Sequence, residues 1–175
     1  MLELVAVANE PTRAAARELL EEYLRWIGEV ANESYGLTLD VPAMVESDLG
    51  DRVKFYPPTG RFYLLGHEGR YVGIGCLKRL APGVGEIQRM YVRPQARGIG
   101  AGRRIVERLI EDARLIGYRT LRLESLRALT AAHTLYRSVG FVEIAPYAKN
   151  SMEHYHPAAD LERYRRSAVF MELRL

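Results

Sequence analysis

The segment at residues 84 to 102, VGEIQRMYVRPQARGIGAG, constrains the fold more than any other part of the chain. Apolar and polar residues alternate from position 86 to 92, Pro94 ends that pattern, and a glycine loop then opens a long amphipathic stretch. The pattern predicts a strand, a tight turn and a helix whose first amide groups lack partners within the helix. Such a helix start attracts anions through its free amides and its dipole, and glycine lets a ligand approach the main chain. The sequence therefore predicts a site for a pyrophosphate-bearing ligand.

The spacing of the glycines distinguishes this loop from two other phosphate-binding loops. Gly98, Gly100 and Gly102 do not fit G-x-G-x-x-G, because Arg103 stands where the third glycine would be required. No lysine follows the loop, as a nucleotide P-loop of the form G-x-x-x-x-G-K-[ST] would require. The pattern that remains is Q/R-x-x-G-x-G/A, which Gln95, Gly98 and Gly100 fill.

A second motif follows at residues 132 to 141, where AHTLYRSVGF matches A-x-x-L-Y-x-x-x-G-F. The two motifs in this order closely resemble the GNAT superfamily of acetyl-CoA-dependent N-acetyltransferases, and the resemblance covers roughly residues 60 to 145. It implies an α/β fold with one GNAT-like domain over residues 1 to 175. Its sheet would be mixed, mostly antiparallel and flanked by helices on both faces, and the cofactor-binding core would span about 84 to 141.

Hydrophobic periodicity predicts the elements of such a fold in the order βααβββαβαββ. Strands are expected at residues 2–8, 61–67, 71–79, 84–92, 120–124, 141–144 and 168–173. Helices are expected at about 10–29, 41–49, 98–116 and 129–139, the first capped by Asn9 and the last ended by Gly140. On the 84–92 strand, Glu86, Gln88 and Met90 should share one face.

The composition argues against several other classes of protein. The 175 residues, 48% of them hydrophobic and 27% charged, suit one soluble domain with a sizeable core. No apolar run approaches the ~18 residues of a membrane span, so no membrane contact is expected. The net charge is only +3 and the basic residues are scattered, which argues against nucleic-acid binding despite a pI near 9.1. The single cysteine, Cys76, indicates a buried structural thiol in a reducing cytoplasm.

The resemblance implies how the cosubstrate acetyl-CoA would bind. The main chain at Met90, Tyr91 and Val92 would pair with the pantetheine arm like an added strand, and the Met90 amide would polarise the acetyl carbonyl. The loop residues that would hold the pyrophosphate are Gln95, Arg97, Gly98, Ile99, Gly100, Ala101 and Gly102. The alternative is that these glycines only make a tight strand-to-helix turn.

Three residues are candidates for proton transfer. Tyr136 should face inward by its helical spacing, and the matching family tyrosine protonates the thiolate leaving group; the alternative is a core tyrosine. Glu86 occupies a strand position where many family members carry a glutamate that deprotonates the amine, and Glu124 on the next strand is a second candidate. Either carboxylate could instead pair with an arginine, and ordered water alone could act as the base.

Acceptor recognition is less defined by the sequence. Arg61 and Arg89 are candidates, because guanidinium groups clamp a carboxylate or phosphate well, but structural salt bridges explain both residues equally well. The expected acceptor is an amine on a small molecule. A protein N-acetyltransferase and a non-catalytic CoA-binding sensor or scaffold are the alternatives.

The stretch at residues 146 to 166 is the least family-like part of the chain. It should form a loop that covers the acceptor site or contacts another subunit, and a homodimer is open by analogy with the superfamily. Glu153, His154 and His156 lie close together in it. Alternating histidines in a polar loop are typically solvated, so we expect no metal site.

Overall fold

The computed structural model describes residues 1–148 and 150–175. The strands are β1 (Leu2–Ala6), β2 (Arg61–His67), β3 (Arg70–Ala81), β4 (Val84–Val92), β5 (Thr120–Leu126), β6 (Val142–Ile144) and β7 (Ala168–Arg174). The α-helices are α1 (Glu10–Tyr35), α2 (Val41–Gly50), α3 (Ala101–Ile116), α4 (Thr130–Ser138) and α5 (Leu161–Ser167). Short 3-10 turns are η1 (Pro94–Ala96), η2 (Glu153–Tyr155) and η3 (Ala158–Asp160).

The seven strands form one sheet in the order β1-β2-β3-β4-β5-β7-β6. In the described residues only β4 and β5 pair in parallel, which confirms the predicted mixed, mostly antiparallel sheet. The parallel pairing runs only from Val84 opposite Thr120 to Glu86 opposite Arg122. Beyond that point β4 has no strand partner on its β5 side among the described residues, so the sheet opens between these two strands.

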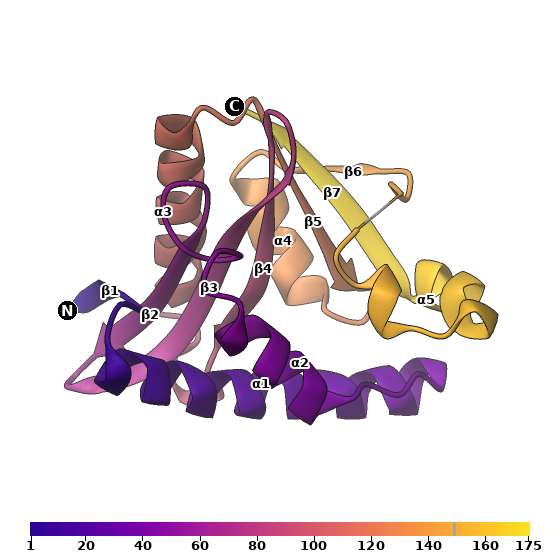
Figure 1. The fold of residues 1–175 in the computed structure, drawn as a ribbon, viewed down its shortest axis with the longest axis horizontal. Helices are drawn as coiled ribbons and strands as arrows, with labels where there is room; N and C mark the ends of the chain where they lie inside the picture. The colour runs from indigo at the N-terminus through magenta and orange to yellow at the C-terminus, as the bar shows by residue number, and fades with distance from the viewer. Residues whose placement is uncertain (149) are drawn as a thin grey trace.

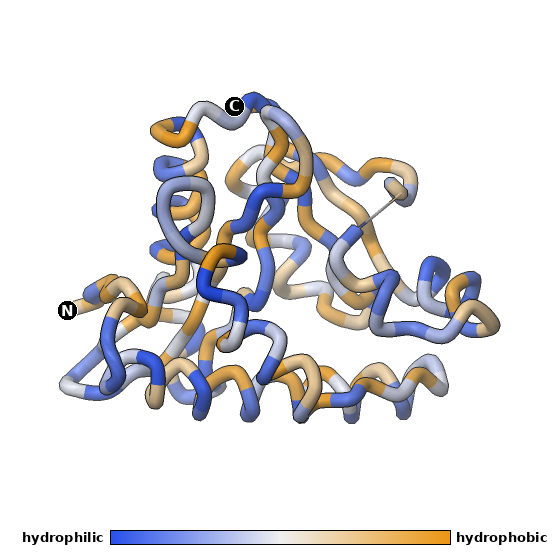
Figure 2. Tube along the Cα trace, in the orientation of Figure 1, coloured by the Kyte–Doolittle hydropathy of each residue, from blue (hydrophilic) through white to orange (hydrophobic). Residues whose placement is uncertain are grey.

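Helices cover both faces of the sheet, as predicted (Figure 1). One hydrophobic core forms where α1 and α2 pack on one face, and a second forms where α3 packs on the other. The apolar stripe expected on α3 is buried there, through Ile105, Val106, Leu109, Ile110 and Ala113. Figure 2 shows the same division along α1, whose hydrophobic residues lie mainly toward the strands and whose hydrophilic residues lie away from them.

Helix α1 begins where the sequence predicts and ends later. Asn9 caps it through a capping box with Thr12: the Thr12 amide donates to the Asn9 side chain and the Asn9 amide to the Thr12 hydroxyl. The predicted end near residue 29 is wrong. The helix continues because Ala31 is still buried against the core, and it ends at Gly36, whose φ of 64° suits the left-handed C-cap.

A β-bulge in β4 changes which side chains share a face. Cys76 on β3 pairs with Gln88, but Ile74 pairs with Tyr91, so β4 has one extra residue here, and Arg89 has a φ of 54°. Met90 therefore packs with the core on the α3 side and Tyr91 with the core on the α1 side. The expectation that Met90 shares a face with Glu86 and Gln88 is wrong, because the bulge interrupts the two-residue alternation.

The stretch at residues 146 to 166 is more ordered than the loop predicted for it. It contains η2, η3 and most of α5, and α5 contacts α1 and β7.

Cys76 is an unpaired, buried thiol, as expected. In the part of the chain that the structure describes, no helix is both long and apolar enough to cross a membrane.

Candidate active site

The opening between β4 and β5 leads into a groove of about 540 Å³. Its walls come from the C-terminal end of β4, the glycine loop, the start of α3, and α4 with the two residues before it. Trp26 from α1 contributes one further side chain. The predicted cofactor residues that line the groove are Met90, Tyr91, Val92, Arg97, Gly98, Gly100, Ala101 and Gly102.

The glycine loop presents free amide groups to this groove. Gly98 and Gly100 have φ values of 81° and 85°, and a side chain at either position would meet open space. Gly100 caps α3 without a side-chain hydrogen bond, and the first turn of α3 has no acidic residue to compete for its amides. Arg97 adds a cation and lies over the Trp26 ring at 5.3 Å. This arrangement fits a pyrophosphate.

Two of the predicted loop residues do not line the groove. Gln95 lies in η1 and is exposed, and Ile99 is 47% exposed. They shape the turn rather than its inner surface. Gly102, in contrast, faces α4, where an added Cβ would come within 3.0 Å of Leu135 Cδ2.

A second, smaller cavity of about 50 Å³ lies beside the groove. Leu129 lines both spaces, so they adjoin at the start of α4. Most of the smaller cavity is apolar, and its polar lining residues are Tyr23, Arg89, Glu124, Ser125, His156 and Tyr164. A volume of this size accommodates a few water molecules or a compact organic group.

Tyr136 is buried on α4 and lines the large groove, as its helical spacing predicted. Its ring packs edge-on against Phe141 at 6.0 Å. Burial raises the pKa of the Tyr136 hydroxyl, and the nearby Tyr23 and Glu124 raise it further. The hydroxyl therefore keeps its proton at neutral pH.

Glu124 lies on β5 and lines the smaller cavity. Burial raises the pKa of this carboxyl to about 7, and the charge of Glu86 adds to the rise. A hydrogen bond from the Tyr164 hydroxyl, at 2.7 Å, and the charge of Arg89 act in the opposite direction. Glu124 can therefore exchange a proton close to neutral pH.

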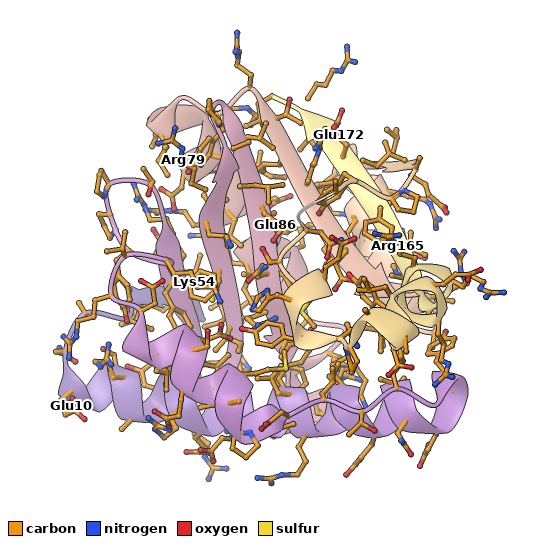
Figure 3. The ribbon with its side chains drawn as sticks, turned by 45° about the vertical axis from the view of Figure 1, so that its right-hand side comes forward. Glu10, Lys54, Arg79, Glu86, Arg165 and Glu172 are labelled. Atoms are coloured by element: carbon orange, nitrogen blue, oxygen red, sulfur yellow. The ribbon has the colours of Figure 1, made fainter. Side chains whose placement is uncertain are left out.

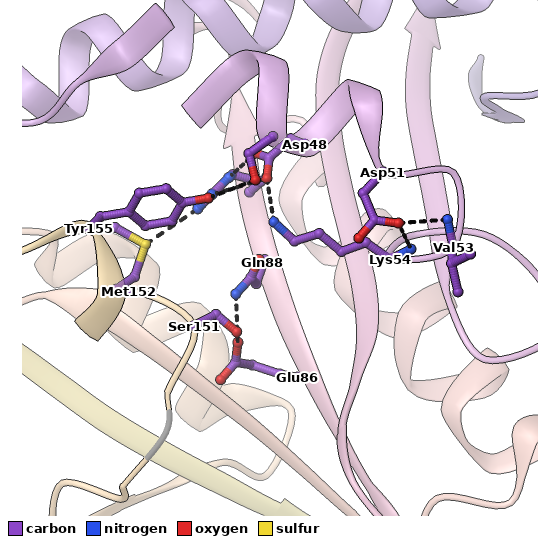
Figure 4. A network of polar contacts seen from close by, with 11 residues as sticks. Asp48, Asp51, Val53, Lys54, Glu86, Gln88, Ser151, Met152 and Tyr155 are labelled. Carbon is purple, nitrogen blue, oxygen red and sulfur yellow. Dashed lines mark hydrogen bonds and ion pairs between the residues drawn. The ribbon is translucent and has the colours of Figure 1, made fainter. Parts of the chain in front are cut away.

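Glu86 occupies a different environment and lines neither cavity. It is 1% exposed and lies on the sheet next to the segment that precedes α5 (Figure 3). Its carboxylate accepts hydrogen bonds from Gln88 Nε2 at 2.5 Å, from the Tyr147 hydroxyl at 3.0 Å and from the Ser151 hydroxyl. Three protein donors thus hold the carboxylate, and Figure 4 shows two of them, Gln88 and Ser151.

Arg89 forms a buried ion pair rather than an open clamp. Its Nε and Nη2 donate to Asp48 on α2 at 2.5 and 3.3 Å, and Lys54 Nζ lies 2.5 Å from the same carboxylate (Figure 4). Its Nη1 contacts only the Met152 sulfur among the described residues, and Arg89 still lines the smaller cavity. The salt-bridge interpretation of Arg89 is therefore the one that its contacts fit.

Arg61 lies away from both cavities. Its guanidinium donates to the carbonyls of Pro58 and Gly60 and lies 3.7 Å from Asp112 on α3. Its predicted contact with the acceptor is not compatible with this position. The reason is that β3 and β4 separate β2 from β5 in the sheet, and the Arg61 side chain reaches Asp112 on α3 instead.

The residues that complete the site come mainly from the predicted 41–49 helix and the 146–166 stretch, in which the sequence singled out no individual residue of the acceptor site. Asp48 had a usable signal, because a lone acid shares the buried face of α2 with Met44 and Val45. The sequence gives no comparable indication for Tyr164 beyond the aromatic content of its segment. Nothing in the local sequence indicates which carboxylate this tyrosine would contact.

The histidines of this segment pack on aromatic rings. His154 lies 3.8 Å from the Tyr155 ring, and His156 stacks on Tyr164 at 4.5 Å between ring centroids. The described residues contain no group of three potential metal ligands. Burial lowers the pKa of His156, so this ring is neutral at physiological pH.

Comparison with known proteins identifies the family. The Acetyltransferase (GNAT) family model matches residues 27–141. An IAA acetyltransferase from Azospirillum brasilense is 32% identical over 145 residues, which cover 82% of this chain and 88% of that protein. The chain therefore belongs to the GNAT family of acetyltransferases, whose members are acetyl-CoA-dependent enzymes.

Solved structures show the same fold. An acetyltransferase from Streptococcus agalactiae 2603 aligns with a TM-score of 0.70 at 19% identity, over 99% of this chain and 98% of that one. The paia N-acetyltransferase from Thermoplasma acidophilum, in complex with coenzyme A, aligns with a TM-score of 0.67 at 13% identity, over 100% and 99% of the two chains. These structures confirm the predicted fold. Membership of the acetyltransferase family confirms the predicted enzyme class, which favours an enzyme over a CoA-binding sensor or scaffold.

Proposed function

We propose that this enzyme transfers the acetyl group of acetyl-CoA to a primary amine on a small molecule by direct attack. The observation that carries the proposal is that Leu129 lines both cavities, with Tyr136 in the wall of one and Glu124 in the wall of the other. Acetyl-CoA would occupy the large groove and the amine the smaller cavity. The open side of β4 and the amides of the glycine loop would hold the cosubstrate, as the family resemblance implies.

The proton-carrying residues supply what the reaction needs. The amine nitrogen attacks the thioester carbonyl carbon, a C–N bond forms and the C–S bond breaks. Glu124 takes the proton that the amine loses, and Tyr136 gives its proton to the departing thiolate. The opposite tasks of the two groups agree with the directions of their pKa shifts, since Tyr136 retains its proton and Glu124 exchanges one near pH 7.

Glu124 is a better base than Glu86 on the geometry. Glu124 lines the acceptor cavity and has one side-chain donor, Tyr164, whereas Glu86 is buried outside both cavities with three donors. Protonating Glu86 would disrupt an arrangement in which all its partners donate. We therefore assign Glu124 as the base and Glu86 as an anchor that fixes Tyr147 and Ser151.

The size and lining of the smaller cavity support a small acceptor. Its volume of about 50 Å³ and its largely apolar walls fit a compact amine better than a long polar chain. Met152, His156 and Tyr164 close it on the side of the 146–166 stretch. This closure supports the expectation that the stretch covers the acceptor site.

Cosubstrate binding is the first test. Calorimetric titration of acetyl-CoA and CoA should show micromolar binding to the wild type and none to a Gly98→Asp/Gly100→Asp double variant, since two carboxylates would repel the pyrophosphate. Gly69→Asp is the matched control. This glycine also has a positive φ, 75°, with open space around it, but lies in the β2–β3 turn away from the groove. Equal loss of binding in the control would refute the glycine-loop site.

Turnover is the second test, measured as thiol release from acetyl-CoA with a panel of amino acids, aliphatic amines, polyamines and N-terminal peptides. Tyr136→Phe should lower turnover by roughly 10 to 1,000-fold without changing CoA affinity, and Glu124→Gln by roughly 100-fold or more. Turnover with the peptides alone would overturn the small-molecule acceptor. Full activity of Glu124→Gln together with an inactive but folded Glu86→Gln would assign the base to Glu86.

A further inference from the structure

The hydroxyl of Tyr164 lies between two acceptors and has one proton. It is 2.7 Å from Glu124 Oε2 and 2.8 Å from Asn150 Oδ1. A tyrosine hydroxyl donates one hydrogen bond at a time, so it cannot donate to both oxygens together. The oxygen that does not receive the hydroxyl proton has two possibilities. It makes no hydrogen bond to Tyr164, or it carries a proton of its own and donates that proton to the tyrosine oxygen.

The orientation of Asn150 is fixed by the backbone around it. Its Oδ1 accepts from the amides of Met152 and Glu153 at 3.1 and 3.2 Å, and its Nδ2 donates to the Tyr147 carbonyl at 3.4 Å. These three contacts require the oxygen, not the nitrogen, to face Tyr164. Asn150 is therefore an acceptor for the tyrosine hydroxyl whatever the protonation state of Glu124.

Tyr164 itself is held firmly in place. Its side chain is 1% exposed, stacked on His156 and packed edge-on against Phe170 at 6.4 Å between ring centroids. Only the hydroxyl proton is free to turn. It can point to Glu124 or to Asn150 without any movement of heavy atoms.

We infer that Tyr164 and Asn150 form a proton-responsive pair that positions Glu124 and stabilises it in both protonation states. When Glu124 is ionised, Tyr164 donates to it and Asn150 keeps its two backbone donors. When Glu124 carries a proton on Oε2, that proton bonds the tyrosine oxygen and the tyrosine proton turns to Asn150. No polar atom of the three side chains then loses its partner when the base accepts a proton from the amine. The inference rests on the proposed role of Glu124.

The other groups around Glu124 do not offer this exchange. The titratable and charged groups that face it come from every element packed against β5: Glu86 and Arg89 on β4, Tyr23 on α1, Tyr136 on α4, His156 before η3, Tyr147 and Tyr164. Arg89 is engaged by Asp48 and acts through its charge. Tyr164 is the one described side chain that makes a hydrogen bond to the Glu124 carboxylate.

The test is the acid limb of the pH profile of kcat/KM in Tyr164→Phe. The bond that Tyr164 donates to the ionised carboxylate is charge-assisted and stronger than the bond that the protonated carboxyl makes to the tyrosine oxygen. Losing the hydroxyl should therefore move the midpoint to higher pH by about one unit. Tyr147→Phe is the matched control, because it removes a tyrosine hydroxyl bonded to Glu86 instead and should leave the midpoint in place. A midpoint unchanged in Tyr164→Phe, or shifted equally in both variants, would overturn the inference.

A second readout does not depend on activity. Carboxyl carbon NMR of the labelled protein without substrates follows the Glu124 titration directly, with the signal assigned by its loss in Glu124→Gln. In Tyr164→Phe, the midpoint of the Glu124 titration should move to higher pH by the same amount. An unchanged titration midpoint would overturn the pairing. An acid limb that survives in Glu124→Gln would refute the catalytic role alone, because the NMR titration would still report the link to Tyr164.

Discussion

Removing the charge of Asp48 should destabilise the enzyme strongly, because this carboxylate is the partner of two buried cations. Asp48 is fully buried, Arg89 is 6% exposed, and the Lys54 side chain is 11% exposed. Asp48→Asn keeps the shape of the side chain but leaves Arg89 and Lys54 facing each other without a carboxylate. Breaking a buried pair in this way costs about 3 to 5 kcal/mol. The corresponding fall in melting temperature is roughly 6 to 20 °C for a chain of this size.

Urea denaturation at pH 7 measures the free energy of unfolding, and thermal melting checks it. Glu46→Gln is the matched control on the same helix, since Glu46 pairs with Arg17 at the surface and its side chain is 68% exposed. We expect no measurable change in its urea midpoint. A loss below about 1 kcal/mol in Asp48→Asn, the range of exposed pairs, would refute the idea that this ion pair is desolvated.

The pH dependence gives an independent check of the same pair. Burial alone would raise the pKa of Asp48, but the charges of Arg89 and Lys54 outweigh it and hold the pKa below its ordinary value. A carboxyl whose folded pKa is depressed contributes stability above its unfolded pKa and loses it as the pH falls through the folded value. The difference in the free energy of unfolding between wild type and Asp48→Asn should therefore become smaller as the pH falls below about 4. If this difference stayed constant at lower pH, Asp48 would not be the ionised partner of Arg89 and Lys54.

Two further predictions concern packing and the Glu86 anchor. Gly75→Ala should lower the free energy of unfolding by about 1 to 3 kcal/mol, because a Cβ there would collide with Ile105 on α3. Gly50→Ala is the control, since its Cβ meets open space and should leave the stability nearly unchanged. The urea midpoints of the two variants test this prediction. Tyr147→Phe removes one donor to the buried Glu86 and should cost about 1.5 to 3 kcal/mol in the same assay, and an unchanged midpoint would mean that water replaces the hydroxyl.

The sequence predicts well those features that depend on local periodicity and turn chemistry. The α3 stripe is buried as its helical spacing requires, and the glycine loop lies where a strand gives way to a helix. Both follow from residues that are neighbours in the chain. The groove is therefore largely foreseen from two motifs, one on each of its walls.

The parts that escaped prediction depend on contacts between distant residues. Arg89 meets Asp48 across 41 positions, and Tyr164 meets Glu124 across 40. The bulge at Arg89 also has no local signature, yet it reverses the direction of Met90 relative to Glu86. Without the fold, Glu86 and Glu124 look alike as carboxylates on neighbouring strands, and only their hydrogen-bond partners distinguish them.

Those partners also explain how the opening between β4 and β5 keeps its shape. Among the described residues, no backbone pairing holds the two strands together beyond Glu86, so their separation depends on groups that contact both. The stretch before β7 does this, with Tyr147 and Ser151 bonded to Glu86 on β4 and Tyr164 bonded to Glu124 on β5. Asn150 joins the two sets through the Tyr147 carbonyl and the Tyr164 hydroxyl. In the proposed reaction, the stretch that lines the smaller cavity would also fix Glu124 there, which would couple the fit of the acceptor to the position of the base.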